Sequence, residues 1–350
     1  MLKENFTTAR NLRIAITSYC NLDCEYCGGH KGYSNEKRGT MEDYRRETID
    51  GYRLKLEELK QLLQKFYEVG YRGVSLTGGE PLVRKDWYKI IEYCKELGFE
   101  RREITTNGVL LEEYIKRHGY PKDLTLIKVS LDTTDRQEFL KITKKDDFDK
   151  VISSVKVASQ EIETRANRVV LRSELKDLDH FIRYCKEIGF KSTNLLDLVY
   201  YPNRRVASER EFFETEYVPA TELKEYLETV YGYTFKRNKY GYECIDEDGF
   251  KIILKETRLT LRDEQCQNCP IYCQEGKFTT RIATDGNITM CPDCYCEQTS
   301  LSGRDLLSGK AGIEELQKLY DSVDKSEESD TFDQFIDTYS LKLRGPKLWK

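Results

Sequence analysis

Three cysteines near the start of the chain are spaced closely enough to share one metal centre. Cys20, Cys24 and Cys27 form the pattern C-x3-C-x2-C directly after an apolar, strand-like segment. Thiolates at this spacing can surround one iron–sulfur cube, and a four-iron cube needs four ligands, so one iron stays open. Structural zinc sites close their coordination shell, so an open iron indicates catalysis. A zinc site completed by His30 is the alternative interpretation.

A second group of cysteines lies in the last third of the chain. Asp285-Gly286, between two apolar segments, predicts a two-residue hairpin that would bring cysteines on either side of it together. Cysteines brought together in this way can hold a metal centre, and a structural zinc ribbon is one interpretation of it. Its expected ligands are Cys266, Cys269, Cys273 and Cys291, and Cys294 or Cys296 could replace one of these.

The elements that must position these residues alternate between strands and helices over the first two thirds of the chain. Apolar stripes at 56–67 and 87–97 predict helices that end at Gly70 and Gly98. Six strand–helix units in a row predict a partial (β/α)6 barrel, with Cys94 and Cys185 as small core residues. The expected strands are 12–17, 73–77, 103–106, 126–131, 168–172 and 193–199.

Beyond residue 200 the alternation stops. We expect a barrel over 1–205, a connector over 206–250 and an auxiliary-cluster domain over 251–350. The charged stretch 206–217 reads as a loop, 249–261 as strands in a possible hairpin, and 324–330 as a polar, exposed segment. Helices are expected near 313–323 and 332–339, and Cys244 is expected to be structural.

Polar and glycine-rich motifs follow the predicted strands, where the catalytic groups of barrels collect. In Gly78-Gly79-Glu80-Pro81, the glycines allow a ligand close to the backbone and Glu80 can accept from an ammonium group. Helix capping is the alternative role for polar residues of this kind, Asp132 and Thr133 above all. The other two motifs are Thr105-Thr106-Asn107 and Ser130-Leu131-Asp132.

The C-x3-C-x2-C pattern, with Tyr26 before its third cysteine, resembles the radical S-adenosylmethionine (SAM) superfamily. The resemblance implies that the open iron binds SAM, and that one electron cleaves it to methionine and a 5′-deoxyadenosyl radical that takes a hydrogen from the substrate. It implies that the 78–81 motif holds the methionine end of SAM. The implied SAM-contacting or cavity-facing residues are Tyr26, Gly78, Gly79, Glu80, Thr106, Asn107 and Ser130.

Residues 11 to about 200 are most similar to the GTP cyclase of molybdenum-cofactor biosynthesis, through NLRIAITSYCNLDCEYC, SLTGGEPLVRKD, ITTNGVLL and VSLDTTD. The second cysteine group resembles the SPASM or shorter twitch extension of radical SAM enzymes, and this resemblance implies an auxiliary four-iron cluster there. In the cyclase, two arginines that bind the GTP phosphates occupy the positions of Tyr19 and Ser75. Loss of those charge-assisted bonds makes GTP an unexpected substrate here.

The implied activity is that of a radical SAM enzyme. We expect it to modify a ribosomally made peptide by a crosslink, an epimerisation or a similar change, with a flavodoxin- or ferredoxin-type reductant. Because the first strand begins by residue 12, we expect no N-terminal peptide-recognition domain, and a separate leader-peptide-binding protein could serve instead. The alternative is an oxidoreductase or cyclase for a small molecule such as a sugar, nucleoside or cofactor precursor. A non-catalytic iron–sulfur or zinc protein is the alternative of another class.

Composition bounds the partners and the compartment. The 350 residues carry 57 basic and 61 acidic side chains, a balance that excludes a general basic field for nucleic acid or anionic membrane. No apolar run reaches the length of a signal peptide or of the roughly 20 residues that span a membrane. Twelve cysteines without a signal peptide favour metal binding over disulfides. We expect a cytoplasmic protein.

Overall fold

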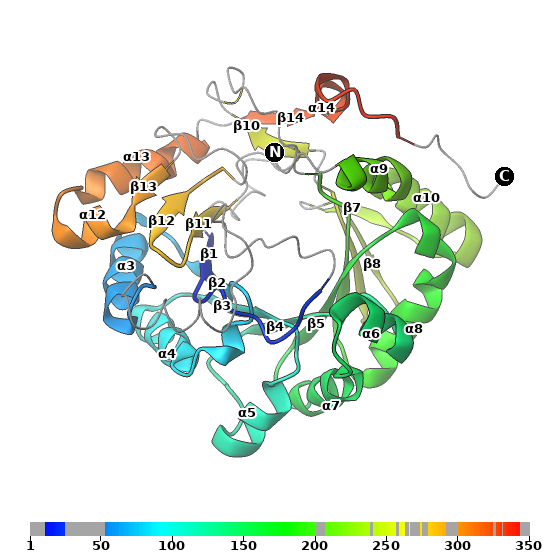
Figure 1. Cartoon of the computed structure of the whole chain (residues 1–350), viewed down its shortest axis with the longest axis horizontal. Helices are drawn as coiled ribbons and strands as arrows, with labels where there is room; N and C mark the ends of the chain where they lie inside the picture. The colour runs from blue at the N-terminus through cyan, green and yellow to red at the C-terminus, as the bar shows by residue number, and fades with distance from the viewer. Residues whose placement is uncertain are drawn as a thin grey trace.

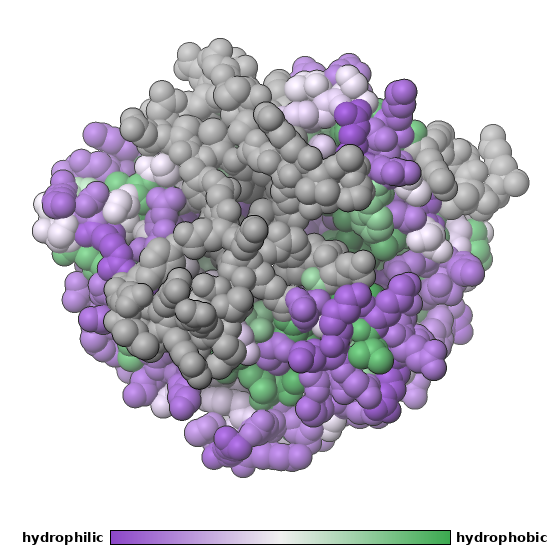
Figure 2. All heavy atoms as spheres, viewed as in Figure 1, coloured by the Kyte–Doolittle hydropathy of each residue, from purple (hydrophilic) through white to green (hydrophobic). Residues whose placement is uncertain are grey.

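The computed structural model forms a ring of strands enclosed by helices (Figure 1). It describes residues 11–24, 53–200, 207–238, 241–256, 259–262, 266, 274, 279–291, 300–324, 327–330 and 332–343. Figure 2 shows the outer helices presenting mostly hydrophilic residues on the visible face, with hydrophobic ones in small patches. Within the described ranges, no helix combines the length and the hydropathy needed to cross a membrane.

Six parallel strands in chain order form the wall of the predicted partial barrel, which is confirmed. The fifth strand was wrongly expected at 168–172: it begins at Thr164, and Arg172 already lies in a short 3-10 helix. Alternating polar residues at 164–168 hide its first half from a search for apolar runs. The strands are β1 (Asn11–Ala15), β2 (Gly73–Thr77), β3 (Arg101–Thr106), β4 (Leu126–Ser130), β5 (Thr164–Val169) and β6 (Ser192–Leu196).

Helices between these strands cover the outside of the ring (Figure 1). Three of them end at glycines with positive φ, at Gly70, Gly98 and Gly189, as the left-handed cap of a helix requires. Cys94 of α4 and Cys185 of α8 are fully buried, as predicted. The helices are α3 (Leu56–Val69), α4 (Trp87–Leu97), α5 (Leu111–His118), α6 (Arg136–Thr143), α7 (Phe148–Ala158) and α8 (Leu178–Ile188), with 3-10 helices η3 (Pro81–Val83) and η4 (Arg172–Asp177).

The two faces of the wall differ in polarity. In β4, Ile127 and Val129 are buried in the core against the helices, whereas Lys128 and Ser130 are half-buried on the other face. Since successive side chains of a strand point to opposite faces, the half-buried polar set lines the inside of the ring, called the lumen below. Buried apolar packing therefore holds the barrel from outside and leaves its lumen polar.

The sheet continues beyond β6. Strand β9 (Lys251–Lys255) pairs in parallel with β6 and antiparallel with β8 (Gly241–Ile245), which pairs with β7 (Lys236–Asn238). The hairpin in this region is thus β8–β9 and not one within 249–261. Its turn is closed by Asp246, whose carboxylate accepts from the backbone of Asp248 and Phe250. Cys244 is buried, as predicted.

The segment expected to be a charged loop forms a helix, α9 (Ala207–Glu216), followed by α10 (Ala220–Tyr231). Phe213 is buried at 1% exposure among aromatic side chains, and Glu216 accepts from the Ser173 amide at 2.9 Å, so one apolar side chain and polar contacts together dock this charged helix. Within the segment expected to be exposed, β14 (Glu327–Asp330) pairs antiparallel with β10 (Leu259–Arg262).

The other edge of the sheet also lies in the last third of the chain. Strand β11 (Thr280–Ile282) pairs in parallel with β1, and the predicted hairpin at Asp285-Gly286 leads into β12 (Asn287–Thr289). Strand β13 (Ser300–Ser302) follows, with helices α12 (Gly303–Ser308), α13 (Ile313–Asp324) and α14 (Phe332–Thr338). Strands from all three expected segments share one twelve-stranded sheet, and the boundaries at 205 and 250 stay predictions.

Candidate functional site

The loops after β1 and β2 touch backbone to backbone. The amide of Gly79 donates to the carbonyl of Thr17 at 2.8 Å, and the amide of Glu80 donates to the carbonyl of Tyr19 at 2.7 Å. A Cβ added at Gly79 would lie 2.1 Å from the Tyr19 oxygen, and one at Gly78 would lie 2.2 Å from that of Thr17. Both positions therefore need glycine for this approach.

The carboxylate of Glu80 joins the β2 loop to the end of β3. Its Oε1 accepts from the Thr106 hydroxyl at 2.7 Å and from the Leu82 amide at 2.9 Å, and its Oε2 accepts from the Asn107 amide at 2.7 Å. Burial raises the pKa of Glu80 to about 7, although these three hydrogen bonds act to lower it. Thr106, at 2% exposure, is occupied by Glu80 and does not face the lumen.

The side chain of Asn107 reaches the cysteine loop. Its Nδ2 donates to Asn21 Oδ1 at 2.8 Å and lies within hydrogen-bonding reach of Cys20 Sγ at 3.7 Å. Its Oδ1 accepts from the Val109 amide at 3.1 Å. The amide of Leu22 donates to the same sulfur at 3.5 Å. Of the two candidates at the end of β3, Asn107 is thus the one directed at the cysteine site.

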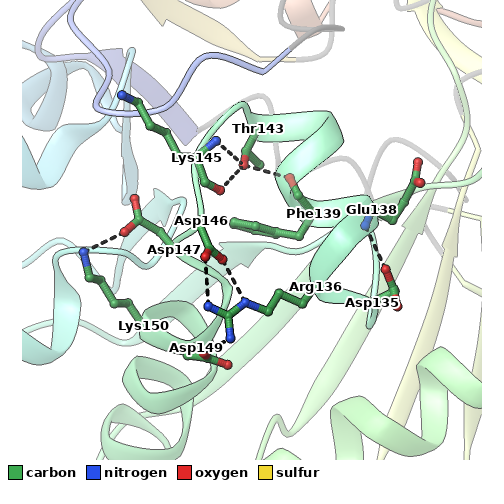
Figure 3. A network of polar contacts seen from close by, with 10 residues as sticks. All are labelled: Asp135, Arg136, Glu138, Phe139, Thr143, Lys145, Asp146, Asp147, Asp149 and Lys150. Atoms are coloured by element: carbon green, nitrogen blue, oxygen red, sulfur yellow. Dashed lines mark hydrogen bonds and ion pairs between the residues drawn. The ribbon is translucent and has the colours of Figure 1, made fainter.

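The turn between α6 and α7 supports the cysteine loop from another side. The Asp23 amide, between the first two cysteines, donates to the carbonyl of Thr143 at 3.0 Å. Figure 3 shows how this turn is braced: the guanidinium of Arg136 forms a fork with Asp146 and also contacts Asp149. Asp135 caps α6, accepting from the Glu138 amide, so the cap is neither Asp132 nor Thr133. Asp132 instead accepts from the amide of Val169.

The described part of the first cysteine site fits an iron–sulfur ligand set. Cys20 and Cys24 are half-buried at a strand end, and the sulfur of Cys20 is a hydrogen-bond acceptor, the environment that a thiolate ligand needs. Cys27 and Tyr26 lie outside the described residues. Among those described, no three His, Cys, Asp or Glu side chains are grouped so as to hold a metal.

Cys291, one of the second cysteine group, lies at the opposite end of the barrel from Cys20. Strand β12 runs antiparallel to β11, and β11 runs parallel to β1, so Cys291 comes out near the start of β1 while Cys20 follows its end. Both Cys266 and Cys291 are half-buried. The backbone of Cys291 exchanges two hydrogen bonds with the Thr289 hydroxyl. The remaining predicted or alternative ligands, Cys269, Cys273, Cys294 and Cys296, lie outside the described residues.

An ion pair lies inside the lumen, between the end of the barrel near Cys20 and the end near Cys291. Lys128 of β4 contacts Glu103 of β3, and their side chains are 16% and 18% exposed. Burial would raise the pKa of Glu103, but Lys128, Arg101 and Arg165 hold it below its ordinary value. Burial lowers the pKa of Lys128, with Arg13 and Arg165 acting in the same direction. Basic side chains therefore outnumber acidic ones around this pair.

Sequence-based expectation missed the lumen pair, although the chain contains an indication of it. Lys128 sits between Ile127 and Val129, as Arg13 sits between two apolar residues of β1, and a lone charge in a buried strand marks a polar lumen. Ser75 lies beside Arg13 and Glu103 in the register of the sheet and is buried.

Polar side chains also gather toward the C-terminal ends of β4, β5 and β6. Ser130 is half-buried opposite Asn167 in the register of the sheet. The side-chain Nδ2 of Asn194 donates to Oδ1 of Asn167 at 2.8 Å. Ser130 thus lies at the same strand-end level as the residues expected to contact SAM.

Comparison with known proteins agrees with this geometry. The sequence model of the radical SAM superfamily matches residues 14–185. A probable GTP 3′,8-cyclase of Methanocaldococcus jannaschii is 29% identical over 296 residues, covering 83% of this chain and 87% of the relative. One of Saccharolobus solfataricus is 28% identical over 305 residues, covering 86% and 87%.

A solved structure shares the fold. Streptococcus suis SuiB bound to S-adenosylmethionine superposes with a TM-score of 0.56 at 18% identity, over 89% of this chain and 68% of that one. At this identity the likeness concerns the fold alone.

Proposed function

We propose that Cys20, Cys24 and Cys27 hold the [4Fe-4S] cluster of a radical SAM enzyme, whose superfamily model matches residues 14–185, and that the substrate is a small anionic molecule bound in the lumen. The cluster and SAM together supply a 5′-deoxyadenosyl radical, which removes a hydrogen atom from the substrate. The chain's own residues must hold SAM at one end of the lumen and the substrate within it.

The joined loops at the ends of β1, β2 and β3 support the SAM end of this proposal. Gly78 and Gly79 bring the β2 loop against the cysteine loop, and Glu80 ties that loop to Asn107. A ligand of the open iron would therefore meet a preorganised edge and need little rearrangement of the backbone. In this arrangement Glu80 is a support for Asn107 and Thr106, and its contact with the SAM ammonium group stays a prediction. So do the roles of Tyr26 and Ser130.

The lumen pair carries the substrate proposal. Lys128 and Glu103 lie on neighbouring strands, surrounded by Arg13, Arg101 and Arg165. Phosphate and carboxylate groups bind well to such a set, because ionic hydrogen bonds inside a low-dielectric cavity are the strong ones. Arg165 is itself held in place, because its Nε donates to Ser192 Oγ at 2.8 Å.

The relatives' names favour a small molecule over a peptide, since GTP 3′,8-cyclases act on a nucleotide. The peptide-modification hypothesis, and with it a leader-binding partner, therefore has less support than the alternative. Tyr19 and Ser75 still stand where the cyclase family has phosphate-binding arginines, so we propose a different anionic substrate and not GTP. The cations proposed to bind it lie on β3, β4 and β5, at Arg101, Lys128 and Arg165.

The second cysteine group supports an auxiliary [4Fe-4S] cluster in this proposal. Cys266 and Cys291 are half-buried, and Cys291 comes out at the edge of the barrel opposite Cys20. The cations of the lumen lie between the end of the barrel near Cys20 and the end near Cys291. A substrate bound there would face SAM on one side and the auxiliary cluster on the other, with Cys269 and Cys273 as its further proposed ligands.

The test is SAM cleavage by anaerobically reconstituted enzyme with dithionite, in the presence of nucleotides including GTP, sugar phosphates, carboxylated metabolites and peptides. We expect one anionic small molecule to stimulate 5′-deoxyadenosine formation. Lys128→Gln should then raise the KM for that compound about 10- to 100-fold, the value of one charge-assisted hydrogen bond of about 1.5–3 kcal/mol. Lys116→Gln, on the exposed face of α5, is the matched control. Stimulation by peptides alone would contradict the proposal.

A further inference from the structure

The orientation of the Asn107 side chain is determined by its neighbours. Its Oδ1 accepts from the Val109 amide at 3.1 Å, so the other end of the group, Nδ2, must face the cysteine loop. There it has two acceptors, Asn21 Oδ1 at 2.8 Å and Cys20 Sγ at 3.7 Å. An inverted amide would place two oxygens against each other and would leave the Val109 amide facing a donor.

The backbone of Asn107 is held as firmly as its side chain. Its amide donates to Glu80 Oε2 at 2.7 Å, and the other oxygen of that buried carboxylate is held by Thr106 and Leu82. Glu80 in turn is fixed to the cysteine loop through its own amide and the carbonyl of Tyr19. The donor nitrogen of Asn107 is thus positioned before any cluster binds.

Iron bound to Cys20 would favour the contact. As a thiol, Cys20 can itself donate to Asn21 Oδ1, at 4.0 Å. As an iron-bound thiolate it has no proton to donate, and its sulfur can only accept. Two N–H groups that then reach this sulfur are those of Leu22, at 3.5 Å, and Asn107, at 3.7 Å. Of these two, only the Asn107 group belongs to a side chain.

We propose that Asn107 is a positioning residue that sets the reduction potential of the SAM-binding cluster through its N–H···S bond to Cys20. Hydrogen bonds to the sulfurs of an iron–sulfur cluster favour the more negative, reduced state, and so raise its potential. The step concerned would be the transfer of one electron from the external reductant to the cluster held by these cysteines, with no bond of the protein made or broken. The inference rests on the proposed assignment of Cys20 as a cluster ligand.

The test is the midpoint potential of the cluster, measured by dithionite titration with electron paramagnetic resonance. The resonance to follow is the one that changes on addition of SAM, which separates this cluster from an auxiliary one. Asn107→Asp keeps an acceptor for Val109, removes the donor and adds a negative charge near the sulfur. Asn107→Ala removes the donor without adding charge.

We expect both variants to have a lower potential than the parent enzyme, with Asn107→Asp the lower of the two. At a fixed reducing poise, the ratio of reduced to oxidised cluster should fall up to about tenfold in Asn107→Ala, which corresponds to about 59 mV for one electron. Asn194→Ala, which removes an amide that donates to Asn167 on the far side of the barrel, should keep the parental potential. The measurement counts only loaded clusters, so partial loading does not affect it.

Unchanged potentials in both Asn107 variants would overturn the inference. A potential that falls equally in Asn194→Ala would also overturn it, because the effect would then not be specific to the cysteine site. A different result would show that Cys20 is not a ligand of this cluster: the Cys20→Ala variant would then retain the resonance that responds to SAM. Activity is not needed for any of these readouts.

Discussion

Replacing Gly79 by alanine tests the close contact between the β1 and β2 loops. The added Cβ would lie 2.1 Å from the Tyr19 oxygen, 2.4 Å from its carbonyl carbon and 2.6 Å from the Ser18 oxygen. All three are backbone atoms, so no flexible side chain can move aside. The two loops must separate, and the hydrogen bonds from Gly79 to Thr17 and from Glu80 to Tyr19 are then lost.

The expected cost follows from these contacts. Two lost hydrogen bonds of about 1 kcal/mol each, together with about 1–3 kcal/mol for overpacking, come to about 3–5 kcal/mol. Gly232→Ala is the matched control, because Gly232 has φ +76° and no atom within 4 Å of an added Cβ. That variant bears only the left-handed backbone, at about 1–2 kcal/mol.

Urea unfolding followed by circular dichroism, with iron content after reconstitution, measures both consequences. Gly79→Ala should be less stable than Gly232→Ala and should bind less iron, because the cysteine loop has moved. If Gly79→Ala is as stable as its control and binds the parental amount of iron, the two loops do not meet as described.

Three further predictions concern ionisation, packing and metal content. The raised pKa of Glu80, about 7 against an ordinary 4.5, means that its contribution to stability is present below pH 4.5 and lost as the pH rises through 7, a change of about 3 kcal/mol. Unfolding of Glu80→Gln without SAM should lack this slope, and parallel pH profiles would refute it. Glu222→Ala leaves the buried Arg172 without its bidentate partner and should cost about 3–5 kcal/mol in urea unfolding, whereas a loss below 1 kcal/mol would refute the pair's importance. Cys291→Ala should lower the iron content from about eight to about four per chain, and an unchanged value would exclude Cys291 as an auxiliary ligand.

Much of the barrel could be predicted from the sequence, because the outward faces of its strands are apolar and packed against helices. The first half of β5 could not be predicted in this way. Its residues Thr164, Ala166 and Arg168 face the helices, but Arg165 and Asn167 stand between them, so no apolar run marks the strand. Helix α9 could not be predicted because its many charged residues form its exposed surface. Its buried side is marked in the sequence by one residue, Phe213, which is too few to show a helical apolar stripe. Patterns of apolar residues report on the core and say little about the lumen.

The candidate site shows the same limit. A close approach at Gly78 and Gly79 could be predicted, but the sequence indicated a ligand there, and the structure places the backbone of Thr17 and Tyr19 against them. The contacts of Glu80 could not, because Thr106 and Asn107 lie on another strand, 26 and 27 residues away along the chain. The lumen pair of Glu103 and Lys128 likewise depends on the register of β3 against β4, which a single sequence does not specify.

The most direct test of the central claim is reductive SAM cleavage by the reconstituted enzyme. Parent protein and the Cys20→Ala, Cys24→Ala and Cys27→Ala variants would be loaded with iron and sulfide anaerobically, mixed with dithionite and SAM, and assayed for 5′-deoxyadenosine. The account predicts product from the parent and none from the three variants. Absence of product from a parent enzyme that holds a reducible four-iron cluster, or undiminished product from the variants, would contradict it.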